Sequence, residues 1–126
     1  MILLIIGVLI PILLALAFLY EFPILYVCGE SMYPTFKEGS ILLCKRLHNA
    51  EGIKKDDILV FTRKKVIEDK TIKYDVVKRA YDVYTIEGET FIYFLGDNPK
   101  ESYDSRSYGY VSEKYLKAKV IKTLKY

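Results

Sequence analysis

The sequence predicts a mainly β fold: a small, coiled antiparallel β-domain or partly open barrel, preceded by one N-terminal transmembrane helix. Three observations support this prediction. The first twenty residues contain no charged side chain, six short runs rich in β-branched, aromatic and aliphatic residues follow, and turn-forming residues separate these runs. Of the 126 residues, about a hundred remain for the domain, which is enough for one modest hydrophobic core.

The N-terminal run, MILLIIGVLIPILLALAFLY, is long enough to span a bilayer as a helix, because about 20 residues at about 1.5 Å rise cover about 30 Å. A cleavable signal peptide is one interpretation, with Ala15 and Ala17 forming a small-x-small cleavage site. The absence of a basic segment before the run, and its continuation to Tyr20, favour an uncleaved anchor. We therefore expect an anchor over residues 1–21 and a β-domain over residues 22–126.

Each β segment is predicted from a short apolar run that ends at turn-forming residues. The last long loop, DNPKESYDSRSYG, is dense in turn formers and is predicted to be irregular. The predicted strands are FPILYVCG (22–29), SILLCKRL (40–47), DILVFTRK (57–64), TIKYDVVKRAYDVYTI (71–86), ETFIYFLG (89–96) and YLKAKVIKTLKY (115–126).

Composition excludes several classes of function. The net charge of +3 is small, and basic pairs alternate with acidic residues, so no nucleic-acid partner is expected. Cys28 and Cys44 match no metal-binding spacing, so neither a metal nor another cofactor is expected. The two cysteines are compatible with a disulfide in an extracytoplasmic domain, but two buried thiols are favoured.

The stretch VCGESMYPTF places Ser31 in a rigid loop directly after the predicted anchor. A nucleophilic serine needs a base, and the one histidine, His48, lies in a polar loop, where a lone histidine is more often a bystander than a catalyst. A lysine can replace histidine when burial keeps the amine neutral. Lys78 fits this requirement because strand alternation places it in one row with Tyr74, Val76 and Ala80. The alternatives are an ordinary turn serine and an edge-strand lysine that reaches water.

Several segments together resemble one family. GESMYPT is similar to the nucleophile box of type I signal peptidases, DILVF to a strand of that family, DVVKR to its lysine box and GDNPKESYDSRSYG to its C-terminal box. The resemblance implies that Ser31 is the nucleophile and Lys78 the general base, and that the hydroxyl of Ser102 orients the lysine amine. It also implies supporting roles for an ion pair of Asp104 with Arg106 and for a turn formed by Gly96, Asp97 and Asn98.

The resemblance further implies that the substrates are signal-peptide-bearing preproteins cleaved after a small-x-small site. We expect an extended peptide to bind as an added strand beside two segments, residues 26–29 and residues 75–77. Gly29 ends the first segment and Asp75 begins the second, and both segments would bind the peptide through main-chain hydrogen bonds. Val27 and Val77 are the candidates for shallow pockets at the −1 and −3 positions. The expected location is the cell membrane, with a cytoplasmic N-terminus and an extracytoplasmic catalytic domain. The lipid bilayer is an expected partner, and a protein-export channel is a further candidate.

The chain also departs from the family pattern. Gly29 replaces a serine that donates to the oxyanion in some bacterial members, Pro99 replaces a common arginine, and the usual Pro-Gly-Asp after the lysine box is missing. Lys78 stands where related enzymes of the endoplasmic reticulum and of many archaea have histidine. Two other functions therefore remain open: a Ser–Lys self-cleaving protease of the repressor type, and a membrane-tethered β-domain that binds export substrates without cutting them.

Overall fold

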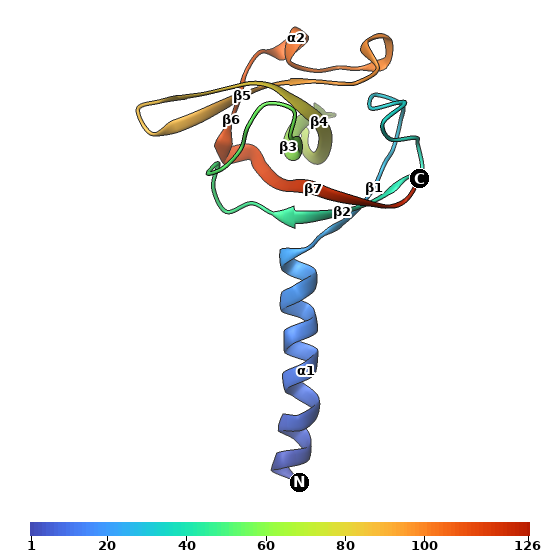
Figure 1. Cartoon of the computed structure of the whole chain (residues 1–126), viewed down its shortest axis with the longest axis vertical. Helices are drawn as coiled ribbons and strands as arrows, with labels where there is room; N and C mark the ends of the chain where they lie inside the picture. Colours follow the sequence, from blue (N-terminus) through green and yellow to red (C-terminus); the bar gives the residue numbers. More distant parts are fainter.

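A computed structural model describes residues 1–126 and begins with one long helix, α1 (Ile2–Glu21). None of its residues is buried, and it stands away from the β-domain (Figure 1). It is long and apolar enough to cross a membrane, a property that anchors share with signal sequences. Two contacts tie its end to the domain: Arg46 Nε donates to the Tyr20 carbonyl at 2.7 Å, and His48 lies 3.2 Å from the Glu21 carboxylate.

The domain is one open, seven-stranded antiparallel sheet with the order β1-β2-β7-β3-β4-β5-β6. The mainly β, antiparallel prediction is confirmed, and each predicted strand is present. A two-residue strand and three short helical turns were not predicted. The elements are β1 (Ile24–Tyr26), β2 (Ile41–Arg46), β3 (Ile58–Ile67), β4 (Lys70–Ile86), β5 (Glu89–Leu95), η1 (Pro99–Glu101), α2 (Ser105–Tyr108), β6 (Val111–Ser112), η2 (Glu113–Tyr115) and β7 (Leu116–Lys125).

The hydrophobic core forms two clusters. The first includes Met32 and Phe36 from the loop after β1, packed on Leu42 and Cys44 of β2. The second surrounds Phe61 of β3, whose ring stacks on Phe94 of β5 with a centroid distance of 4.2 Å, and it includes Leu59, Ala80, Ile92 and Val111. Alternation along β3 and β4 supplies residues to both clusters, since Val60 and Val77 face the first while Leu59 and Val76 face the second.

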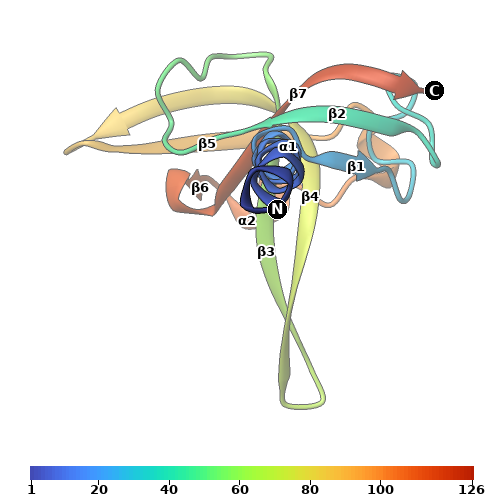
Figure 2. The same ribbon diagram turned by 90° about the horizontal axis from the view of Figure 1, so that it is seen from below.

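Strand β4 is much longer than its partner β5, and this difference leaves part of one edge open. From Arg79 to Ile86 it pairs with β5, whereas its N-terminal half, residues 70–78, pairs only with β3. Residues 70–78 of β4 and the facing part of β3 form a two-stranded hairpin that projects from the side of the domain (Figure 2). Backbone groups on this edge are available to an added strand.

Candidate functional site

The loop between β1 and β2 meets strand β4 at a serine–lysine pair. Lys78 Nζ lies 2.7 Å from Ser31 Oγ, and this is the only hydrogen bond of the lysine side chain. The residue is 5% exposed. Burial lowers the pKa of Lys78, and the negative charge of Asp104 opposes part of this effect. The amine is therefore held beside a hydroxyl in surroundings that favour its neutral form.

Backbone contacts on both sides fix the position of Ser31. The next residue, Met32, is buried in the core, as expected from the sequence. Asn98 forms two hydrogen bonds to the loop: its backbone N–H donates to the Ser31 carbonyl at 2.9 Å, and its side-chain amide donates to the Glu30 carbonyl at 3.0 Å. The Ser31 N–H makes no hydrogen bond within the protein, so it is free to donate to a negatively charged oxygen that develops beside Ser31.

Gly96 permits this close approach of the C-terminal loop. A Cβ atom at this position would lie 2.7 Å from the Ser31 carbonyl oxygen and 2.0 Å from Ser102 Oγ. Both distances are far below van der Waals contact, so any side chain here would push the loop away from Ser31. The turn formed by Gly96, Asp97 and Asn98 thus lies directly against the serine, where the sequence placed it.

Asp97 connects this turn to two other segments. Its carboxylate accepts two hydrogen bonds from Arg79, at 2.9 and 2.7 Å, and a third from the Thr35 hydroxyl. Burial alone would raise the pKa of Asp97, but the bonds from Arg79 and Thr35 outweigh it and hold that pKa below its usual value. Through this carboxylate, β4, the turn and the serine loop are joined.

Asp104 is the centre of a second polar cluster. Arg106 donates to it from Nε and from Nη2, at 3.0 and 2.8 Å, so the ion pair expected from the sequence is present. The Gly96 N–H donates to the same carboxylate at 2.9 Å. Burial would raise the pKa of Asp104, but hydrogen bonds from Arg106, Gly96 and Ser102 together hold that pKa well below its usual range. The carboxylate therefore stays charged at neutral pH.

The structure does not show the contact expected between Ser102 and the lysine amine. Ser102 Oγ donates to Asp104 at 2.8 Å instead. The charged carboxylate is the stronger acceptor, and it lies only two residues away in the same loop. Ser102 is thus a link between Asp104 and the closely packed Gly96, and it does not orient Lys78 in this structure.

Ser31 and Lys78 lie at a cleft of about 270 Å³. Its lining residues are Cys28, Gly29, Glu30, Ser31, Arg63, Tyr74, Val76, Lys78, Glu101 and Tyr103. The row of Tyr74, Val76 and Lys78 follows the alternation expected for β4, and Gly29 lines the cleft as expected.

The cleft is not lined by the side chains of Val27 and Val77, which were predicted to form substrate pockets, or by that of Asp75, which was predicted to bind through its main chain. Val27 is buried in the first core cluster, and Val77 packs against that cluster from the opposite face of β4. The Asp75 carboxylate forms an ion pair with Lys117 at 2.7 Å. The period of a strand explains this outcome, because neighbours of Val76 point away from the face that carries Lys78. The backbone of residues 75–77 still lies on the open edge of β4.

The remaining candidate residues are the single histidine and the two cysteines. His48 lies at the junction with α1, beside Glu21. Both cysteines are free; Cys44 is buried, but Cys28 is exposed at the cleft, which corrects the prediction of two buried thiols. Burial raises the pKa of the Cys44 thiol to about 11. No group of acidic, histidine and cysteine side chains is arranged to hold a metal ion.

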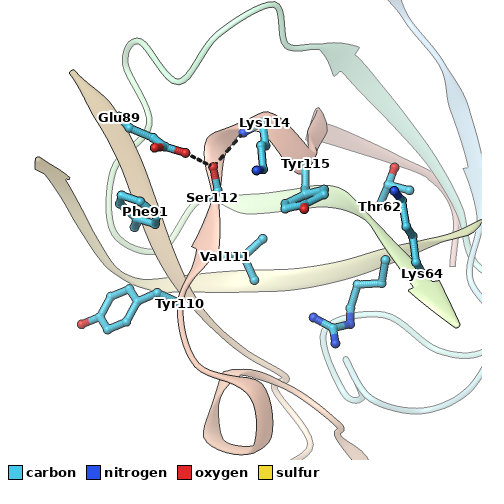
Figure 3. A pocket seen from close by; sticks show the side chains of 10 residues that line it. Thr62, Lys64, Glu89, Phe91, Tyr110, Val111, Ser112, Lys114 and Tyr115 are labelled. Atoms are coloured by element: carbon cyan, nitrogen blue, oxygen red, sulfur yellow. Dashed lines mark hydrogen bonds between the residues drawn. The ribbon is translucent and has the colours of Figure 1, made fainter. Parts of the chain in front are cut away.

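The largest cleft of the molecule, about 520 Å³, is a different one (Figure 3). It lies between β3 and the segment that contains β6 and η2, and it also contains a serine, Ser112. The hydroxyl of Ser112 donates to the Glu89 carboxylate and accepts from the Lys114 N–H. A carboxylate is a weak base towards a serine hydroxyl, and no lysine amine or imidazole contacts Ser112. Size alone therefore does not identify the site, and it is in the smaller cleft that a buried amine contacts a serine hydroxyl.

No protein-family model matches the sequence, and no curated protein matches it significantly.

Proposed function

We propose that this chain is a membrane-bound serine endopeptidase that removes N-terminal signal peptides from exported proteins after a small-x-small site. The observation that carries the proposal is the buried amine of Lys78, 2.7 Å from the Ser31 hydroxyl, at a cleft bordered by an unpaired strand edge. The resemblance of the serine, lysine and C-terminal boxes to type I signal peptidases supports it.

The chemistry follows from the pair. The neutral Lys78 amine accepts the hydroxyl proton as Ser31 Oγ attacks the scissile carbonyl carbon, and the Ser31 N–H donates to the resulting oxyanion. Collapse of this intermediate breaks the C–N bond, and the ammonium of Lys78 returns the proton to the leaving amine. Water then attacks the ester, with Lys78 again accepting a proton, and the Lys78 ammonium returns that proton to Ser31 Oγ as the C–O bond breaks and the carboxylate product leaves.

The open edge of β4 gives the substrate its path. An extended peptide that adds beside residues 74–78 bonds through its main chain, which suits substrates that share little sequence. On the other side of the same cleft lie Cys28 and Gly29. A peptide between these two segments passes directly over Ser31.

Helix α1 serves in this proposal as an uncleaved anchor in the cell membrane. With its N-terminus in the cytoplasm, it places the β-domain on the outer side, where signal-peptide cleavage sites emerge from the bilayer. Ser31 is only ten residues beyond the end of α1 at Glu21. The active cleft would then stay close to the membrane surface.

The test is cleavage of a preprotein with an Ala-x-Ala site by the full-length chain in a nonionic detergent. We expect mass spectrometry to show a single cut after the second alanine and to show none with Ser31→Ala. Ser107→Ala, which removes an exposed hydroxyl from α2, is the matched control and should cleave like the wild type. Binding without cleavage would instead support a non-catalytic domain, and cleavage restricted to the chain itself would support a self-cleaving protease.

A further inference from the structure

Arg63 stands out because its guanidinium group has no hydrogen-bond partner in the protein. The other three arginines are engaged: Arg46 with a backbone carbonyl, Arg79 with Asp97 and Arg106 with Asp104. Arg63 makes no such bond, and its Nε is buried without a partner. Burying a charged donor without a partner is unfavourable, so a position that retains one is a candidate for binding an acceptor from outside.

Aromatic rings hold this guanidinium in place. Its central carbon lies 3.6 Å from the centroid of the Tyr108 ring and 5.9 Å from that of Tyr103. Burial raises the pKa of Tyr108 to about 12, so the ring carries no compensating charge at neutral pH. Stacking covers a face of the guanidinium and Nε is buried, whereas the two Nη groups at its outer end have no partner in the protein and remain free to donate in the plane.

The group also lies in the proposed substrate path. Arg63 lines the cleft that contains Ser31 and Lys78, and the sheet register pairs it with Tyr74 on the open-edged half of β4. Tyr74 precedes Lys78 by four positions on the same face, which corresponds to about 13 Å at about 3.3 Å per residue. Glu30 and Glu101 line this cleft too, but both are exposed and neither forms an ion pair with Arg63.

We propose that Arg63 forms a specificity subsite for an acidic side chain of the peptide substrate, about four residues from the scissile bond. A carboxylate is the acceptor that fits the free edge of a guanidinium, because two parallel N–H donors match its two oxygens. The inference rests on the proposed endopeptidase function for the identity of the ligand. It adds a preference for an acidic residue, whereas the small-x-small rule specifies only the residues at −1 and −3.

The test measures binding separately from cleavage. Fluorescent peptides with one Ala-x-Ala site each carry a single Glu or Gln, placed at −2, at one of the positions −4 to −6 or at one of the positions +2 to +6, so that both alanines of the site are kept. Their affinity for the full-length Ser31→Ala protein in a nonionic detergent is measured by anisotropy. We expect Glu to bind about tenfold more tightly than Gln at a position near four residues on one side only, as for one charge-assisted hydrogen bond.

Two further variants assign the preference to this residue. Arg63→Gln in the same background should abolish the difference between Glu and Gln, while Arg63→Lys should keep part of it. Lys64→Gln removes the neighbouring charge, which points to the other face of the hairpin, and should keep all of it. Equal affinity at every position, or a preference that survives in Arg63→Gln, would overturn the subsite.

Cleavage by proteins with Ser31 intact separates this proposal from the one it rests on. If all peptides are cut at equal rates regardless of Arg63, the subsite is wrong and the endopeptidase stands. If the Arg63-dependent affinity is found but no peptide is cut, the subsite stands as a peptide-binding site and the proposed hydrolysis is wrong.

Discussion

Lys78 and Arg79 are neighbours on β4, yet the two faces of the strand treat their charges in opposite ways. On the cleft face, the lysine amine is buried and its only hydrogen bond is to a hydroxyl; burial lowers its pKa, and the charge of Asp104 opposes only part of this effect. On the other face, the guanidinium of Arg79 donates to the Asp97 carboxylate, and this bond raises the pKa of Arg79. One strand thus presents a base that can lose its proton and, one residue later, a cation that cannot.

The comparison shows that surroundings assign these roles as much as residue type does. A general base must be able to give up its charge at the working pH, and burial without a counter-ion favours this. A structural tie, meaning an ion pair that holds two segments of the chain together, needs the reverse: a charge that is never lost, and acceptors positioned to bind it. The Arg79–Asp97 pair is such a tie, because Asp97 belongs to the turn that packs against Ser31.

The largest expected effect on activity comes from replacing Lys78 with a residue that keeps its positive charge at every working pH. Lys78→Arg keeps the positive charge but removes the ability to accept a proton, so kcat/KM for an Ala-x-Ala peptide should fall by about 10³-fold or more. Lys78→Ala should be equally inactive, whereas Lys78→His should retain slight activity because imidazole is a base. Lys73→Arg, an exposed position on the hairpin, is the control. Activity of Lys78→Arg within about tenfold of wild type would exclude Lys78 as the general base.

A smaller loss should follow when the tie on the other face is cut. Arg79→Met leaves the half-buried Asp97 carboxylate without its main partner, which should cost about 2 kcal/mol of unfolding free energy at pH 7. Because the folded-state pKa of Asp97 is lowered, its contribution to stability is present above the unfolded pKa of about 3.9 and is lost as the pH falls through the folded-state value. The destabilisation by Arg79→Met should therefore shrink at pH 3, as thermal unfolding in detergent can measure. An equal loss at both pH values would mean that Asp97 is not held charged by Arg79.

Ser102→Ala should have a weaker effect on catalysis. Since Ser102 donates to Asp104 and not to Lys78, its removal deprives the carboxylate of one of its donors but leaves the amine in place. We expect kcat to fall by about tenfold or less, with KM unchanged, as for one lost hydrogen bond of about 1 kcal/mol. A loss of about 10³-fold in single-turnover kinetics would show that the hydroxyl reaches the amine during the reaction.

Sequence patterns predicted the apolar helix, the strands longer than two residues and the row that contains Lys78. These features depend on periodicity and turn chemistry, which are local. The pairing of Ser31 with Lys78 needed the resemblance, because the residues are 47 positions apart. Strand β6 was missed because a two-residue strand has no period of its own.

Two of the contacts that prediction missed depend on tertiary register, since no local pattern indicates that Arg79 bonds to Asp97 or that Arg63 stacks on Tyr108. The bond from Ser102 to Asp104 is local, because the two residues are two positions apart, and it was missed because the resemblance assigned the hydroxyl to Lys78. For Val77 a local signal did exist: strand alternation sets Val77 opposite Lys78, which excludes its side chain from the cleft face. Applying the alternation to the substrate pockets as strictly as to the lysine row would have corrected that expectation.

The smallest effect compares the stabilities of two methionine variants. Lys78→Met removes a buried amine, whereas Arg79→Met removes a paired cation, so at pH 7 the two substitutions should change stability in opposite directions. The folded-state pKa of Lys78 lies below its unfolded value of about 10.4. Between these two values the unfolded chain binds a proton that the folded chain does not, so wild-type stability rises with pH across this window.

Below the folded-state pKa the full cost of burying the charge applies, and above about 10.4 it disappears. Methionine does not titrate, so Lys78→Met should gain stability relative to wild type at pH 7 and lose that advantage at pH 10. We expect a difference of about 1 kcal/mol between the two pH values, the size of a typical single-substitution effect. Thermal unfolding of the full-length chain in one nonionic detergent at both pH values is the measurement, with Lys73→Met as the exposed control. An advantage that is the same at pH 7 and pH 10 would mean that the lysine keeps its ordinary pKa, and the two faces of β4 would then not differ as described.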